Sequence, residues 1–288
     1  MLRHPSLLKY IFNKELSEIY VSIVLRDLAL SMTGIFIPLF LFIDLKYPFY
    51  KVILFFAIYA LSLTLTNPFA AKFTSKYGIK HGILASMIGF TLYVILLATL
   101  ESHNLFYIPA LIFGVANSFY WVNFHADFAR FSDKKNRGNE VSMWFIMAFI
   151  GTLIGPILGS VIITYLGFIT LFIVASLFLL LSAVPLFFSS EVYEPKKFSL
   201  KDIFKKSSIK ETYFYFIYGI RIIVGQVALP IYIFIILKKY ILLGAVASII
   251  ALGSIIVGFF AGKLSNEKKV NTTFRYSSLF HSFGWFFI

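Results

Sequence analysis

The sequence predicts an all-α integral membrane protein built as a parallel repeat of six-helix bundles, with the second bundle incomplete. Three observations lead to this fold class. Apolar stretches of about 20 residues follow one another along most of the chain. Basic residues gather in alternate connections between these stretches. Two segments of the first bundle also recur later in the chain at nearly the same offset.

The apolar stretches are long enough to cross roughly 30 Å of hydrocarbon at 1.5 Å per residue. With 59% hydrophobic and 14% charged residues, this chain of 288 residues has more apolar surface than a soluble core could bury. The predicted spans are 19–43, 50–71, 82–100, 105–129, 141–164, 167–189, 213–237 and 241–262, with a ninth beginning near Thr272.

The last residues, 280–288, are still apolar and have no polar flank. A helix that stops inside lipid leaves carbonyl groups unsatisfied, at a cost of several kcal/mol each. We therefore expect the sequence to be part of a longer chain, and a complete nine-span protein is the alternative.

The basic residues indicate the orientation. Of the 26 Lys and Arg residues, 20 lie in connections on one side, four lie on the other, and Arg26 and Arg221 lie within spans. The positive-inside rule then predicts a multi-pass protein of the cytoplasmic membrane with a cytoplasmic N-terminus. This topology accounts for the net charge of +13 without a nucleic-acid partner. Because the chain has no cysteine, thiolate metal sites are excluded, and we expect neither a metal nor a cofactor.

The internal repeat divides the chain. Residues Ile37–Lys46 recur as Leu229–Lys238 at an offset of 192, and Phe69–Ser75 recur as Phe260–Asn266 at an offset of 191. Six spans separate the copies, so both halves have the same orientation; coincidence in a biased composition is the alternative. The predicted parts are an N-terminal bundle at 1–190, a cytoplasmic linker at 191–212 and a partial C-terminal bundle at 213–288.

Two segments resemble motifs of the major facilitator superfamily (MFS). Between spans two and three that family carries G-x-x-x-D-R-x-G-R-K, and residues 71–80 keep its chemistry at Lys76, Gly78 and Lys80. Ser75 replaces the family's Asp, one partner of the charge pair that closes the cytoplasmic side in relatives. Residues 151–160 are similar to the family's G-x-x-x-G-P-x-x-G-G, which is frequent in exporters.

Small residues spaced four apart allow two helices to approach closely, and proline weakens a helix locally. Gly78 is expected to permit a tight turn. A packing stripe and a gating role are both open for the second motif, and the two are compatible. The residues assigned to gating or packing are Lys76, Gly78, Gly151, Gly155, Pro156, Gly159 and Gly262.

Ionisable residues inside spans are candidates for function, because a charge at the bilayer centre costs from about 3 to more than 10 kcal/mol. The resemblance implies that spans one, four and seven line a central cavity. Asn117, Trp121 and His125 share one face of span four. The substrate or coupling candidates are Arg26, Asp27, Asn117, Trp121, His125, Tyr218, Arg221 and Gln226.

Each candidate also has an ordinary structural interpretation. Arg26 and Arg221 can extend to the interface, His125 can pair structurally with the loop that follows span four, and Trp121 can face lipid. Asp27 is the one acid well inside a span. We interpret it as the proton-coupling group, which binds and releases a proton as its surroundings change.

The resulting expectation is a monomeric secondary transporter that moves a small organic solute by alternating access, coupled to a proton or another ion, with export slightly favoured. The alternative is an integral-membrane transferase acting on a lipid-linked substrate, and a channel is a third possibility. Short external connections without a nucleophile and base argue against the enzyme. The lack of an amphipathic pore helix argues against the channel.

Overall fold

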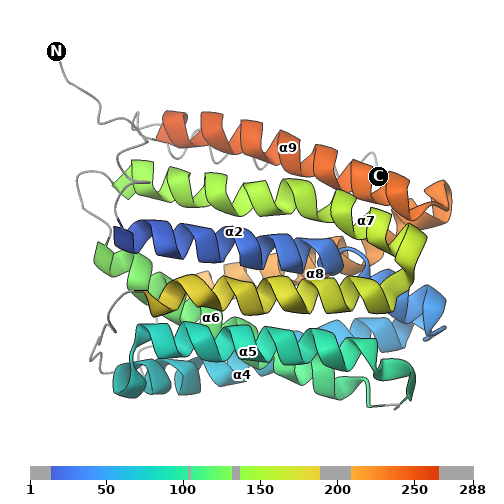
Figure 1. Ribbon diagram of the computed structural model, residues 1–288, viewed down its shortest axis with the longest axis horizontal. Coiled ribbons are helices and arrows are strands. Elements are labelled where there is room, and N and C mark those ends of the chain that lie inside the picture. Colours follow the sequence, from blue (N-terminus) through green and yellow to red (C-terminus); the bar gives the residue numbers. More distant parts are fainter. Residues whose placement is uncertain (1–13, 103–104, 132–136, 189–208, 266–288) are drawn as a thin grey trace.

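The computed structural model describes residues 14–102, 105–131, 137–188 and 209–265, which form a bundle of long helices lying side by side (Figure 1). No strand occurs among these residues, which confirms the predicted all-α class. The ninth predicted span and most of the predicted linker lie outside the described residues. The elements are α2 (Lys14–Gly34), α3 (Ile37–Leu39), η1 (Phe40–Asp44), α4 (Phe49–Tyr77), α5 (Ile79–Ala98), η2 (Leu100–Ser102), α6 (Tyr107–Phe131), α7 (Arg137–Ala183), η3 (Val184–Phe187), α8 (Ile209–Leu237) and α9 (Tyr240–Ser265).

Four described segments are long and apolar enough to cross a membrane by length and composition: Tyr20–Asp44, Phe49–Tyr77, Ile79–Ala98 and Met147–Ala183. Two shorter apolar helices, Val224–Leu237 and Tyr240–Ile256, coincide with the seventh and eighth predicted spans. Helix α6 has 25 residues, so it reaches roughly 37 Å and is also long enough to cross.

The connection predicted at residues 72–80 is much shorter in the structure. Helix α4 continues to Tyr77 and α5 begins at Ile79, so the turn is made at Gly78 alone, with φ 99° and ψ 165°. A side chain would be strained at this φ, which explains the glycine. The prediction placed the end of the helix too early because polar residues such as Lys72 and Lys76 can continue a helix at its exposed end.

Spans five and six are two arms of α7. The backbone departs from helical geometry at Gly167, with φ 82° and ψ 175°, and the chain doubles back there (Figure 1). The predicted boundary at residues 165–167 therefore coincides with the observed turn. The second arm ends in the 3-10 turn η3.

The surface of the bundle is apolar and part of its interior is polar. On α4, Leu61, Leu65 and Phe69 follow one another at helical spacing and are 60%, 61% and 70% exposed. Buried positions on other helices include Arg26 and Asn123. Water would disfavour such an outer face, whereas lipid accepts it, so the burial pattern matches a membrane protein.

Helices α2 and α7 pack closely along the glycine motif. The hydroxyl of Ser31 donates hydrogen bonds to the carbonyl oxygens of Gly151, at 2.9 Å, and Leu28, at 3.1 Å. A Cβ atom at Gly151 would lie 2.6 Å from the backbone nitrogen of Leu28, and one at Gly155 would overlap Ser31. Only residues without a side chain permit this approach.

The same segment of α7 contacts α9 on another side. Gly244 of α9 lies against the carbonyl oxygen of Pro156 and the side chain of Ser160, and a Cβ atom at Gly244 would overlap both. The first arm of α7, before Gly167, lies between α2 and α9 in the bundle (Figure 1). The glycine–proline segment therefore joins helices from the first and second halves of the chain.

The two copies of the repeat share a backbone feature as well as sequence. Lys46 and Lys238, which end the two copies, have φ of 51° and 52°, and the structure describes no other non-glycine residue with positive φ. Within the first copy, α3 packs against α8, the helix that contains the second copy. The first copy therefore lies beside the helix that carries the second.

We predict that Gly155→Ala lowers the free energy of unfolding by about 1–3 kcal/mol, because the new methyl group overlaps α2. The matched control is Gly253→Ala in α9, where a Cβ atom meets nothing within 4 Å. That change should leave stability unchanged or raise it by up to about 1 kcal/mol. Thermal unfolding in detergent measures both, and equal effects would contradict the close contact.

Candidate functional site

The candidate site is centred on an ion pair inside the first span. Nη1 of Arg26 donates to Oδ1 of Asp27 at 2.6 Å, and the two side chains are only 5% and 16% exposed. Both residues belong to the apolar segment Tyr20–Asp44, about two turns from its start. Because Arg26 is buried and paired, it does not extend to an interface as the structural interpretation required.

Aromatic rings from two other helices cover the guanidinium of Arg26. Its carbon Cζ lies 3.5 Å from the ring centroid of Tyr120 and 5.7 Å from that of Trp121, both in α6. Phe90 of α5 contributes a third ring at 4.9 Å. Cation–π contacts of this kind are worth about 2 kcal/mol each when they are desolvated. The charge is thus held by rings on one side and a carboxylate on another.

The neighbouring helices fix the position of the pair. The backbone of Asp27 lies close to Gly151 of α7, where a side chain would collide with α2. The Tyr120 ring is stacked on Phe124 at 5.6 Å and 10°, which restrains its orientation. Helix α6 is also tied to α4 by a buried hydrogen bond between side chains, from Thr74 Oγ1 to Asn123 Oδ1 at 2.8 Å.

One polar atom of the site has no hydrogen-bond partner among the described residues. Nε of Arg26 is buried and unpaired, although a guanidinium has five N–H groups that seek acceptors. Buried donors are normally satisfied, so an unpaired one needs an explanation. The site has more donor capacity than Asp27 uses in this arrangement.

The structure brings some predicted site residues together and separates others. Trp121 lies near Arg26, and His125 stacks on Trp121 at 5.5 Å and 26° but is exposed. Asn117 is buried and donates to the carbonyl oxygen of Phe113 at 3.0 Å, within its own helix. Gln226 is exposed. The side chains of Tyr218 and Arg221 lie outside the described part of the structure.

Sequence reasoning missed two of the rings that cover Arg26. Tyr120 was not among the candidates from span four, yet its ring is the nearest to the guanidinium. Phe90 is one of 35 phenylalanines, and nothing in its local sequence distinguishes it from those that face lipid. A charged residue inside a span implies polarizable neighbours, but the sequence does not say which aromatic residues supply them.

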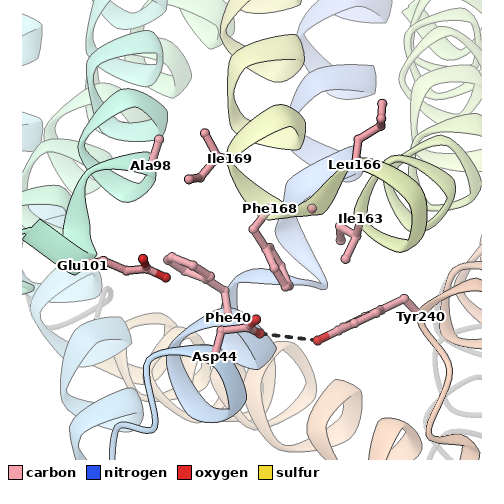
Figure 2. A pocket seen from close by; sticks show the side chains of 10 residues that line it. Phe40, Asp44, Ala98, Glu101, Ile163, Leu166, Phe168, Ile169 and Tyr240 are labelled. Atoms are coloured by element: carbon pink, nitrogen blue, oxygen red, sulfur yellow. Dashed lines mark hydrogen bonds between the residues drawn. The ribbon is translucent and has the colours of Figure 1, made fainter.

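A pocket of about 280 Å³ lies at the far end of the first span (Figure 2). Asp44 of η1 and Glu101 of η2 bring carboxylates to it, and the turn at Gly167 forms part of its wall. The hydroxyl of Tyr240, the first residue of α9, donates to Oδ2 of Asp44 at 3.3 Å. The Tyr240 ring also packs edge-on against Phe168 at 5.6 Å. Sequence reasoning had treated both acids as parts of connections.

A comparison with protein families supports the resemblance seen in the motifs. The family model described as Major Facilitator Superfamily matches residues 19–288, from within α2 through every later described helix. No curated protein matches the chain. The family match therefore rests on the same long series of spans that contains the Arg26–Asp27 pair.

We predict strong coupling between Arg26 and Asp27 in a double-mutant cycle. Arg26→Gln and Asp27→Asn should each lower the free energy of unfolding by about 3–5 kcal/mol, because each leaves one buried charge alone. The double variant should lose less than either single variant, since no lone charge remains. Unfolding in mixed micelles measures all four proteins, and additive losses would mean that the two side chains do not depend on one another.

Proposed function

Because the chain belongs to the Major Facilitator Superfamily, we propose that it moves a small organic solute across the cytoplasmic membrane by alternating access, coupled to protons. The family consists of secondary transporters and not of enzymes, so the chain is a transporter in general and the transferase alternative is excluded. The observation that carries the more specific proposal is the buried pair of Arg26 and Asp27 inside the first span.

Asp27 is the proposed proton carrier. In the closed pair its carboxylate is balanced by Arg26 at 2.6 Å. When the guanidinium moves away, an isolated carboxylate in an apolar bundle is costly, and binding a proton removes that cost. A movement of α2 against its neighbours would therefore convert a change of distance into the uptake or release of a proton.

The contacts around Tyr240 support alternating access. They connect Phe36 and Asp44, in the first half of the chain, with α9, in the second half, at one end of the bundle. A hydrogen bond to a carboxylate contributes about 1.5–3 kcal/mol and an aromatic pair about 0.5–1.5 kcal/mol. Contacts of this size can separate and re-form during each cycle without unfolding the bundle.

The distribution of basic residues supports the orientation of the chain in the membrane that we propose, and the glycine–proline segment supports the direction of transport. Basic residues cluster in the connections that include Lys76, which the positive-inside rule assigns to the cytoplasm. The end of the bundle with Asp44 and Tyr240 then faces outward. The glycine–proline segment at residues 151–160, similar to a motif frequent in exporters, favours export over import.

We predict that Asp27→Asn abolishes proton movement driven by a transported solute, because an amide does not carry a proton in this range of pH. Exchange of solute across the membrane should persist where the variant folds. The measurement uses the protein reconstituted in vesicles that contain a pH-sensitive dye. Since Asp27→Asn leaves Arg26 unpaired, thermal unfolding in detergent first establishes that the variant folds. Unchanged proton movement in a variant that still exchanges solute would refute the assignment.

The absence of cysteine from the chain allows a direct test of orientation. We predict that a membrane-impermeant maleimide added to intact cells labels Lys239→Cys but not Lys76→Cys, since these exposed residues lie at opposite ends of the bundle. Permeabilised cells should label both. The reverse pattern in intact cells would place the N-terminus outside.

A further inference from the structure

The buried charges around Asp27 restrict what the site can bind. Arg26 supplies a permanent positive charge, because a guanidinium does not lose its proton in proteins. The ring contacts worth about 2 kcal/mol each do not replace a counter-ion whose loss costs several kcal/mol. The groups that lie against the pair are uncharged: Phe90 of α5, Tyr120 of α6, Tyr59 of α4 and the α7 backbone at Gly151. The other buried acids on these helices, Glu18 of α2 and Asp127 of α6, lie about two helical turns along from Arg26 and Tyr120.

Four loading states of this site can be compared by charge alone. With Asp27 ionised and nothing bound, the site is neutral. A proton on Asp27 without a ligand leaves a charge of +1, and a bound monovalent anion without a proton leaves −1. With both the proton and the anion bound, the site is neutral again. A lone charge in the membrane costs at least about 3 kcal/mol, so each singly loaded state is disfavoured by at least about a hundredfold.

We propose that the site takes a small carboxylate together with one proton, and that transport of the two is electroneutral with a ratio of one to one. This inference rests on the proton coupling proposed above and adds the class of solute. In each cycle a proton from solution binds the Asp27 carboxylate, and the N–H groups of Arg26 transfer their hydrogen bonds from Asp27 to the carboxylate of the solute. Release of both restores the original ion pair.

The geometry of Arg26 favours a carboxylate over other solutes. Asp27 accepts from Nη1, whereas Nε is buried and has no acceptor among the described residues. A guanidinium can bind a carboxylate through two N–H groups at once, which would satisfy this unused donor. The rings of Tyr120, Phe90 and Trp121 suit an apolar or aromatic body on the solute. A cationic solute would be repelled by Arg26.

The test uses two matched trios of probes that share a body and differ in the end group. One trio is lactate, lactamide and 1-amino-2-propanol, and the other is hippurate, hippuramide and N-(2-aminoethyl)benzamide. Vesicles containing the reconstituted full chain are loaded with a pH-sensitive dye, and uptake, proton movement and current are recorded. Vesicles without protein correct for passive diffusion of the acids.

The expected result is uptake of at least one carboxylate with one proton and no current, while its amide and amine partners are not carried. Asp27→Asn should lose the proton movement and bind the carboxylate at least about tenfold more tightly, because Arg26 then lacks its own counter-ion. The same carboxylate should raise the Tm of the Asp27→Asn protein more than that of the wild type.

Other outcomes overturn the inference in distinguishable ways. Proton movement that depends on Asp27 but accompanies an amide or an amine would leave the proposed transporter intact and refute the carboxylate. Uptake of a carboxylate with current and without proton movement would refute the proton coupling itself. No uptake of either carboxylate, with no rise in the Tm of the Asp27→Asn protein, would also overturn the inference.

Discussion

A guanidinium that cannot lose its proton lies inside an apolar bundle, and this constraint shapes the centre of the protein. Arg26 has its counter-ion one residue away, so α2 itself carries a neutral pair into the membrane. Rings from α5 and α6 complete the surroundings of the charge. Any state of the transporter must keep this charge balanced, because a lone charge in the membrane costs more than the contacts that hold the helices at their ends.

The packing of α7 connects that site with the rest of the molecule. On one side its glycines let α2 approach until the backbones nearly touch at Gly151, beside Asp27. On another side Pro156 and Ser160 contact Gly244 of α9. A displacement of α9 must therefore be accommodated at α7, next to the residue that we propose to carry the proton. Proline within α7 lowers the cost of bending at this place.

The sequence predicts the spans well because lipid restricts both their length and their composition. It predicts the ends of the helices less well. The polar residues after Ala71 were expected to form a connection, but they continue α4 as far as Tyr77. Arg26 and Asp27 were recognisable because charges within spans are rare and costly. Their aromatic neighbours were not, because Phe90 and Tyr120 are selected by contacts between helices, and 35 Phe and 17 Tyr residues offer many equivalent candidates.

The repeat is alike in backbone but unlike in charge. Lys46 and Lys238 share one unusual conformation. When the offset of 192 is applied to Arg26 and Asp27, the equivalent residues in the second half are Tyr218 and Gly219. These two residues cannot form an ion pair. The outer acid Asp44 likewise corresponds to Ile236. If each half had kept such a pair, two protons would be available in a cycle. Because the equivalent positions 218 and 219 hold no charge, the proton site that we propose belongs to the first half.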